Sequence, residues 1–190
     1  MDVITIKDIE KINLKGKVIC FPTDTVYGVG ALIEDEEAIN KIYDLKNRDK
    51  SKPLAVLTGS TNIEKYVLEI NDQARKLMDN YWPGALTLVF KKTNVISDKV
   101  TSGFDTVGLR MPNSAIALAI LQKFGLMATT SVNISGSEPL HDVNEIIENF
   151  KNEIDYIVID KEITSNVSST VVDATGTNLK VLRQGSIYIN

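Results

Sequence analysis

The residues that most often carry covalent and metal chemistry are scarce in this chain. Its 190 residues include one cysteine, Cys20, and one histidine, His141. A single cysteine excludes an internal disulfide and a cysteine-based zinc cage, and one isolated histidine offers no Ser-His-Asp triad. Cys20 lies in the apolar run 18–21 and is predicted to be a small buried side chain. His141 is predicted to lie at the surface.

Long apolar segments and the common nucleotide-binding loops are also missing. No run of about eighteen apolar residues occurs, and the N-terminus lacks the basic-then-apolar pattern of a signal peptide. We therefore expect a cytoplasmic protein without membrane attachment. The net charge of −4 argues against a general nucleic-acid coat. GxxxxGK(S/T) is absent, and Gly28 and Gly30 are followed by Ile33 rather than the third glycine of GxGxxG, so ATP would need a different loop.

Apolar periodicity predicts helices and strands within one domain, residues 1–190, with no internal repeat. Segment 22–30 reads as a polar stretch whose glycines permit tight turns or close approach of a ligand, and segment 82–84 as a structural corner with a packed indole. Alternating helices and strands, with strands dominating later, predict an α/β (α+β) fold with a mixed sheet covered by helices. The expected helices are 6–14, 35–45, 62–68, 72–81, 115–124 and 142–150, and the expected strands 18–21, 54–57, 85–91, 106–111, 126–130, 156–159, 171–173 and 180–183.

Positive charge is concentrated between Lys41 and Lys52, where five cations face two anions. Pro53 disfavours a helical conformation at the residue before it, so the cations should lie on a loop between a helix and a strand. A loop held at both ends can direct several donors at one anion, such as a polyphosphate. A solvated helix C-terminus, where cations are favourable in any case, explains the same charges without a ligand.

Arg110 is a second candidate, near the end of the predicted strand 106–111. Alternation places Thr106, Gly108 and Arg110 on one face of that strand. Because Gly108 leaves room, Arg110 could clamp a carboxylate, and it could equally be a surface residue. Loops 131–136 and 165–170 follow predicted strands and are rich in hydroxyl and amide groups. Ligands bind at such positions in α/β folds, but ordinary polar turns have the same composition.

The polar residues at strand ends are mainly Thr, Ser, Asn, Lys and Arg. Such a site suits positioning and charge stabilisation rather than covalent or general-base catalysis. Phosphoryl and nucleotidyl transfer need little more than that, with Mg²⁺ sharing the phosphate charge. Composition and spacing indicate a candidate polyanion-binding enzyme and go no further.

Seven blocks, in order and across nearly the whole chain, resemble the YrdC-like threonylcarbamoyl-AMP synthase family. They are FPTDTVYGVG (21–30), LKNRDKSKPLAVL (45–57), WPGALTLVF (82–90), DTVGLRMP (105–112), TTSVNISG (129–136), SSTVVD (168–173) and LRQG (182–185). The resemblance implies a nucleotidyltransferase that makes L-threonylcarbamoyladenylate and pyrophosphate from L-threonine, bicarbonate and ATP. It also implies a twisted mixed sheet flanked by helices around a large, positively charged cavity.

The resemblance implies roles for individual residues, none of them as a covalent catalyst. Lys46, Arg48 and Lys52 resemble the family's phosphate-binding groups, which would position the nucleotide and stabilise charge. No protein ligand is assigned to a metal, and Mg²⁺ is expected to arrive with ATP. The implied L-threonine-binding residues are Thr23, Arg110, Ser169 and, as a weaker match, Thr129. The implied ATP-binding residues are Lys46, Arg48, Lys52, Ser131, Asn133, Arg183 and, as a weaker match, Thr106.

The family's product feeds the machinery that forms N6-threonylcarbamoyladenosine in tRNA, and a direct tRNA contact is left open. Val132 stands where the family usually has Ala, and Thr130 where Pro is common. The chain corresponds to the short form, without the extra C-terminal domain of longer members. Two alternatives remain: a paralogue acting as an RNA-binding or regulatory module without adenylation, and the carbamoyl-transfer role of the YrdC-like domain in hydrogenase-maturation enzymes. The retained motif residues disfavour the first, and the lack of an attached acylphosphatase-like or zinc-finger region disfavours the second.

Overall fold

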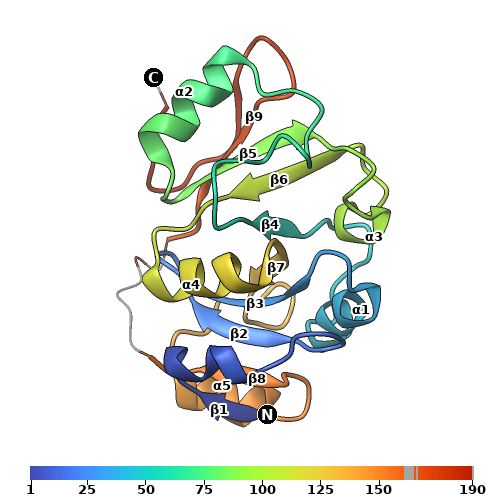
Figure 1. Ribbon diagram of the computed structural model, residues 1–190, viewed down its shortest axis with the longest axis vertical. Helices are drawn as coiled ribbons and strands as arrows, with labels where there is room; N and C mark the ends of the chain where they lie inside the picture. The colour runs from blue at the N-terminus through green and yellow to red at the C-terminus, as the bar shows by residue number, and fades with distance from the viewer. Residues whose placement is uncertain (161–164, 166, 190) are drawn as a thin grey trace.

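A computed structural model of the chain describes residues 1–160, 165 and 167–189 (Figure 1). The strands it describes join one ten-stranded sheet in the order β1-β8-β2-β3-β7-β4-β6-β5-β9-β10. The strands are β1 (Asp2–Ile4), β2 (Ile19–Pro22), β3 (Tyr27–Leu32), β4 (Ala55–Leu57), β5 (Leu86–Lys91), β6 (Thr106–Arg110), β7 (Met127–Ser131), β8 (Tyr156–Val158), β9 (Thr170–Asp173) and β10 (Lys180–Arg183). The helices are the 3₁₀ helix η1 (Ile6–Lys11), α1 (Glu36–Leu45), α2 (Asp72–Tyr81), α3 (Asp98–Thr101), α4 (Ala115–Phe124) and α5 (Val143–Phe150).

The sheet mixes parallel and antiparallel neighbours, as the sequence predicted. Parallel pairs are β1 with β8, β8 with β2, β4 with β6, and β5 with β9. The other neighbours are antiparallel. The prediction of a mixed sheet rather than a purely parallel one is confirmed.

Each face of the sheet carries its own apolar core. In β2, Ile19 and Phe21 pack with η1 and α4, whereas Cys20 and Val18, which directly precedes the strand, point to the face covered by α1, α2 and α5. This alternation follows from the two-residue period of a strand. Cys20 is fully buried, which confirms its predicted place, and burial raises the pKa of its thiol. His141 is exposed, as predicted.

Polar caps begin the longer helices at the predicted places. Asp35 accepts a hydrogen bond from the backbone N–H of Ala38 at 3.0 Å, and Asn71 accepts one from Ala74 at 2.8 Å. Such caps satisfy donors that the first turn of a helix leaves free. The Trp82 corner is also as predicted: the indole is buried, and its N–H donates to the carbonyl of Leu86 at 2.8 Å.

Three predicted elements are wrong. Residues 62–68 form turns and an isolated bridge between Val67 and Lys92, not a helix. The helix-like spacing of Ile63 and Val67 arises because a single turn places both side chains in the core. The helix expected over 6–14 is a short 3₁₀ helix that ends at Lys11. In segment 22–30, which was expected to be a polar stretch, residues 27–30 belong to strand β3, so its glycines do not form a turn, although Gly28 lines the cavity.

Two elements have no counterpart in the sequence prediction. Strand β1 adds the N-terminus to the sheet beside β8, and helix α3 forms a single turn before β6. Both are short, so neither has enough residues to show a periodic pattern. Within the predicted loop 165–170, Asn166 lies outside the described residues, whereas Ser169 and Thr170 are buried. No helix among the described residues has the length and apolar character to cross a membrane.

The face that carries η1 and α4 is only partly covered. In Figure 1 these two helices lie over the strands in the lower part of the molecule, and β4, β6 and β5 have no helix in front of them. Residues on this face of β6, namely Thr106, Gly108 and Arg110, line a cavity. The site therefore occupies the uncovered part of one sheet face.

Candidate active site

The cavity has a volume of about 650 Å³, within the usual range for a small-molecule site. Its walls come from strands β3, β7, β4, β6, β5, β9 and β10, together with segments 23–26 and 48–53. Four cations belong to its lining, and the described lining residues include no Asp or Glu. Those cations are Arg48, Lys52, Arg110 and Arg183.

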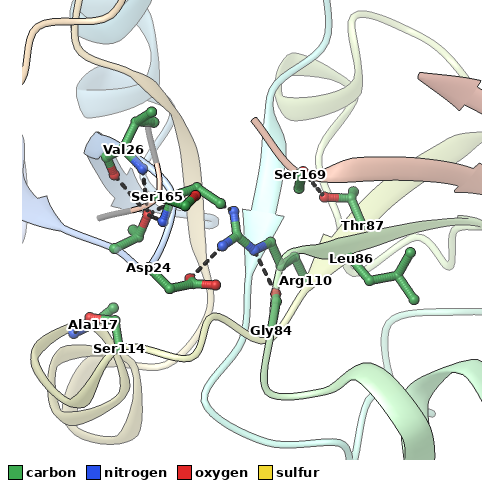
Figure 2. A network of polar contacts seen from close by, with 12 residues as sticks. Asp24, Val26, Gly84, Leu86, Thr87, Arg110, Ser114, Ala117, Ser165 and Ser169 are labelled. Atoms are coloured by element: carbon green, nitrogen blue, oxygen red, sulfur yellow. Dashed lines mark hydrogen bonds and ion pairs between the residues drawn. The ribbon is translucent and has the colours of Figure 1, made fainter. Parts of the chain in front are cut away.

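Arg110 lies at one end of the cavity in a network of fixed contacts (Figure 2). Its Nε donates to the carbonyl of Gly84 at 2.9 Å, its Nη1 donates to Thr25 Oγ1 at 2.8 Å, and its Nη2 forms an ion pair with Asp24. The sequence left open whether Arg110 clamps a ligand or lies at the surface. The residue is only 6 % exposed, so it is buried and not a surface residue. Burial lowers the pKa of Arg110, and the charge of Asp24 opposes that shift.

The contact between Arg110 and Asp24 joins segments that are four strands apart in the sheet. Asp24 follows β2, and β2 is separated from β6 by β3, β7 and β4. Four strand spacings of about 4.8 Å would put β2 and β6 about 19 Å apart in a flat sheet. The turn after β2 therefore folds toward β6 and closes one side of the cavity.

Two N–H groups of Arg110 have no partner among the described residues. A guanidinium has about five N–H donors, and its printed contacts use three, one on each nitrogen. One free N–H therefore remains on each terminal nitrogen. Such a pair can take a carboxylate in a bidentate contact.

Ser169 directly precedes β9, two strands from β6 in the sheet, and is joined to Thr87 and Arg183. The hydroxyls of Ser169 and Thr87 are 2.8 Å apart, and Figure 2 shows both beside the Arg110 network. Arg183 donates through Nη2 to the Ser169 hydroxyl at 3.1 Å and to its carbonyl at 2.9 Å. Partial burial lowers the pKa of Arg183. The C-terminal strand thus fixes Ser169 from behind.

Gly185 allows the C-terminal tail to press against this wall. A Cβ atom at position 185 would lie 2.2 Å from the carbonyl oxygen of Ser168 and 2.5 Å from the backbone nitrogen of Thr170. The tail also accepts a hydrogen bond from Thr170, whose hydroxyl donates to the carbonyl of Ile187 at 2.7 Å. The glycine two residues after Arg183 is therefore required by close backbone packing.

The cationic loop leaves helix α1 through a reversal at Asn47. The N–H of Arg48 bonds the carbonyl of Tyr43 at 2.9 Å, and the N–H of Asn47 bonds that of Asp44 at 3.0 Å. With Asn47 in the left-handed conformation at φ 47°, this is a Schellman ending. Because the chain reverses between them, the side chains of Lys46 and Arg48 point to different surroundings.

Lys46 is enclosed by the turn that follows β7. It is 1 % exposed, and its Nζ contacts the carbonyl of Ser131, the carbonyl of Asn133 at 2.9 Å and Asn133 Oδ1 at 2.6 Å. Burial, with a smaller contribution from Arg48, lowers the pKa of Lys46 to about 7. Three acceptors surround the nitrogen, and only an ammonium group can donate to all three. Lys46 thus orders the turn that carries Ser131.

Arg48 and Lys52 form the more open end of the cavity. Arg48 Nε donates to the carbonyl of Lys52 at 3.1 Å, and Nη2 donates to that of Pro53 at 2.9 Å. Lys52 is exposed. These contacts are with the loop's own backbone, so the guanidinium can exchange them for phosphate oxygens without leaving a buried group unsatisfied.

The structure brings nine of the eleven predicted site residues to the cavity wall. The other two, Lys46 and Asn133, lie behind it, bonded to one another, and their roles toward ATP remain predictions. The hydroxyl of Thr23, although at the wall, donates to the carbonyl of Val26 at 2.7 Å within its own turn. The nine residues are Thr23, Arg48, Lys52, Thr106, Arg110, Thr129, Ser131, Ser169 and Arg183.

Sequence reasoning missed three residues that contact the predicted ones. Asp24 and Thr25 bond Arg110, and Thr87 bonds Ser169. Asp24 and Thr25 belong to a polar stretch that the sequence analysis singled out, but nothing there indicates Arg110 as their partner. The alternation of strand 85–91 places Thr87 and Val89 on one face, and this pattern could have indicated that Thr87 faces the site.

The fold and the site define a class: a curved mixed sheet whose hollow face combines a buried arginine clamp with a cationic loop. A model of the family Sua5_yciO_yrdC, described as telomere recombination, matches residues 11–185. The chain belongs to this family. Its predicted membership and fold are thereby confirmed.

Similar proteins extend this result. A threonylcarbamoyl-AMP synthase from Pyrococcus abyssi is 37 % identical over 91 % of this chain and 52 % of its own length. A putative threonylcarbamoyl-AMP synthase from Methanocaldococcus jannaschii is 35 % identical over 95 % of this chain and 86 % of its own. The crystal structure of P. abyssi Sua5 complexed with L-threonine superposes with a TM-score of 0.91, at 34 % identity, over 97 % of this chain and 58 % of that one. The chain thus spans about half the length of the Pyrococcus protein.

Proposed function

We propose that this protein is an L-threonylcarbamoyladenylate synthase, which joins L-threonine, bicarbonate and ATP and releases pyrophosphate. Family membership supports this reading, as do the names of relatives that match nearly the whole chain. The observation that carries it is the division of one cavity into two kinds of anion site. One is a buried guanidinium with two free N–H groups, and the other is an open cationic loop.

The amino acid binds at the Arg110 end. Its carboxylate takes the two free N–H groups of Arg110, and the hydroxyls of Thr25 and Ser169 lie in the same wall to orient its other polar groups. Asp24 keeps the guanidinium in place through the ion pair. Since these contacts exist before any ligand binds, little reorganisation opposes binding.

The triphosphate binds at the loop end, where Arg48, Lys52 and Ser131 line the cavity. The threonine amine first reacts with bicarbonate, losing water, to form a carbamate. A carbamate oxygen then attacks the α-phosphorus, the bond from that phosphorus to the bridging oxygen breaks, and pyrophosphate leaves with its electron pair. Positioning and charge stabilisation suffice for such a displacement, so no side chain needs to form a covalent intermediate.

Mg²⁺ enters with ATP in this proposal. Among the described residues no group of three or more His, Cys, Asp or Glu side chains could hold a metal ion. Asp24, which lies beside the cavity, is engaged by Arg110. The ion is therefore held by phosphate oxygens and water as part of the substrate, as Mg²⁺ often is in nucleotide sites.

The product is consumed by tRNA-modifying machinery that forms N6-threonylcarbamoyladenosine, and we propose a cytoplasmic location for the reaction. A direct contact with tRNA is a further part of the proposal. The net charge of −4 makes the cationic cavity rim, rather than the whole surface, the place where such a contact would form.

The decisive experiment measures pyrophosphate release from ATP with L-threonine and bicarbonate supplied together, singly or not at all. We expect release only when both are present, with threonylcarbamoyl-AMP as the nucleotide product by mass spectrometry. Equal release without threonine would indicate a nucleotide hydrolase. Nucleotide binding without release under any condition would favour the paralogue that acts without adenylation.

A further inference from the structure

Phe104 is an aromatic side chain at the cavity wall to which the proposed reaction gives no role. It is 52 % exposed and is the one aromatic residue among the described lining residues. Single exposed apolar side chains are common on protein surfaces, but this ring belongs to the lining of a cavity, where a ligand can cover it.

The ring lies at the same edge of the sheet as the cationic loop. Strands β4 and β6 are adjacent and parallel, so the segments that lead into them enter side by side. Phe104 comes two residues before β6, and the loop 46–53 comes directly before β4. A backbone hydrogen bond from Leu54 to Val100 at 2.9 Å joins the two segments.

A tyrosine hydroxyl strengthens this link. Tyr43 Oη donates to the carbonyl of Lys52 at 3.1 Å and lies 3.2 Å from the Ser102 hydroxyl. Ser102 belongs to the turn that presents Phe104. These hydrogen bonds hold the turn that carries the Phe104 ring at a fixed position relative to the phosphate-binding loop.

The turn itself holds Phe104 firmly. The backbone N–H of Phe104 bonds the carbonyl of Thr101 at 3.0 Å, and the hydroxyl of the fully buried Thr101 bonds the carbonyl of Phe104 at 2.9 Å. Between them, Ser102 and Gly103 adopt left-handed conformations at φ 55° and 80°. A ring on so constrained a backbone loses little conformational entropy when a ligand covers it.

The neighbouring wall is apolar and has a gap. Val89 and Leu182 line the cavity, and Gly108, which pairs with Val89 across β5 and β6, presents no side chain to it. A Cβ at Gly108 would lie 3.2 Å from the Thr87 methyl group, so a side chain at this position would be crowded. Because no side chain projects from Gly108, a ring of the ligand can approach the wall there.

From this geometry we infer that Phe104 is the stacking platform for the base of the bound nucleoside triphosphate. The inference rests on the proposed function only in taking a nucleotide as ligand: Arg48 and Lys52 receive the phosphates, and the ring beside them receives the base. Every base has a π-face, so stacking on Phe104 contributes affinity without selecting adenine.

The test compares two ligands that share the phosphates and differ in the base. Binding of ATP and of inorganic tripolyphosphate is measured by calorimetry for the wild type, Phe104→Ala and Phe104→Trp, without threonine. We expect Phe104→Ala to weaken ATP binding at least about fivefold, the lower limit for loss of one base–aromatic stack, and to leave tripolyphosphate within about twofold. Phe104→Trp should bind ATP at least as well as the wild type. Leu68→Ala, at an apolar residue 67 % exposed outside the cavity lining, is the matched control and should change neither ligand.

The outcomes separate this inference from the proposed function. Equal weakening of both ligands in Phe104→Ala would mean that the ring only supports the loop, and unchanged ATP binding would place the base elsewhere. Either result overturns the inference. If the variant shows the expected selective loss but the wild type releases no pyrophosphate with threonine and bicarbonate, the platform stands and the proposed reaction fails.

Discussion

The two ends of the cavity hold their cations in opposite ways. At the Arg110 end the guanidinium is buried and bonded to Gly84, Thr25 and Asp24, which come from two segments distant from it in the sequence. At the loop end the partners of Arg48 among the described residues are carbonyls of its own loop, and Lys52 is exposed. One end is complete before a ligand arrives, and the other is finished by its ligand.

This difference sets what each end can contribute. A buried, fully oriented guanidinium discriminates by geometry, because a misplaced carboxylate leaves its donors unpaired. Exposed cations attract phosphate over a longer range, but salt screens them, with a Debye length of about 8 Å at physiological ionic strength. The amino acid should therefore be recognised by shape and the nucleotide mainly by charge.

Replacing the clamp should have the largest effect. Arg110→Lys keeps the charge opposite Asp24 but loses the planar fork, so the KM for L-threonine should rise about 10- to 150-fold, the equivalent of one charge-assisted contact of about 1.5–3 kcal/mol. The KM for ATP should change less than about twofold. Steady-state kinetics with each substrate varied in turn measures both. Arg75→Lys, at an exposed arginine, is the control, and a normal threonine KM in Arg110→Lys would remove Arg110 from the proposed role.

The completed end can also be disturbed from behind. Gly185→Ala places a methyl group against the backbone of residues 168–170, so it should destabilise the fold by about 1–3 kcal/mol and weaken threonine binding through Ser169. Thermal or urea unfolding gives the first value and kinetics the second. Gly176→Ala, where the added carbon meets nothing within 4 Å, is the matched control. Equal stability of the two variants would contradict the close packing of the tail.

At the open end, Arg48→Ala should weaken ATP binding about tenfold without a measurable loss of stability. Lys50→Ala removes an exposed cation from the same loop but not from the cavity lining, so its effect should be much smaller. Raising the salt concentration should increase the KM for ATP more than that for threonine. If both KM values rise equally with salt, the two ends do not differ as described.

The smallest effect is a change in the pH dependence of stability. The pKa of Lys46 is lowered from 10.5 to about 7 in the folded protein, so between these values the unfolded chain binds more protons and the free energy of unfolding rises with pH. The slope is at most about 1.4 kcal/mol per pH unit and vanishes below pH 7. Urea unfolding at pH 7 and 8 should show this rise in the wild type relative to Lys46→Met, whose side chain does not titrate. Parallel stabilities of the two proteins would contradict the lowered pKa.

Much of the fold was predictable because apolar alternation is a local signal. Strands β2, β5, β6 and β7 and helices α1, α2 and α4 lie close to their predicted places. Strand β3 was missed because Gly28 and Gly30 suggested turns or the close approach of a ligand. Gly30 is needed instead for contact between strands, since a Cβ there would lie 2.8 Å from the Thr129 methyl group. The need for a glycine at position 30 comes from a residue of another strand, so the local sequence pattern does not reveal it.

The site divides in the same way. Alternation correctly put Thr106, Gly108 and Arg110 on one face, and all three line the cavity. The ion pair of Arg110 with Asp24 was not predictable, because it joins segments that are four strands apart in the sheet. The burial of Lys46 was not predictable for a local reason. The left-handed conformation of Asn47 reverses the chain, so the side chains of Lys46 and Arg48 point in different directions.

The pairing of β5 with β9 has a consequence for how the protein is made. These parallel strands join Leu86 to Thr170, and the Thr87–Ser169 contact spans 82 residues of chain. Contacts between such distant segments form late, because closing long loops costs entropy before the contact repays it. A growing chain on the ribosome would therefore have its cationic loop and Arg110 long before Ser169 and Arg183 emerge. Ligand binding should appear abruptly once β9 and β10 have emerged, since these strands close the wall that the earlier residues face.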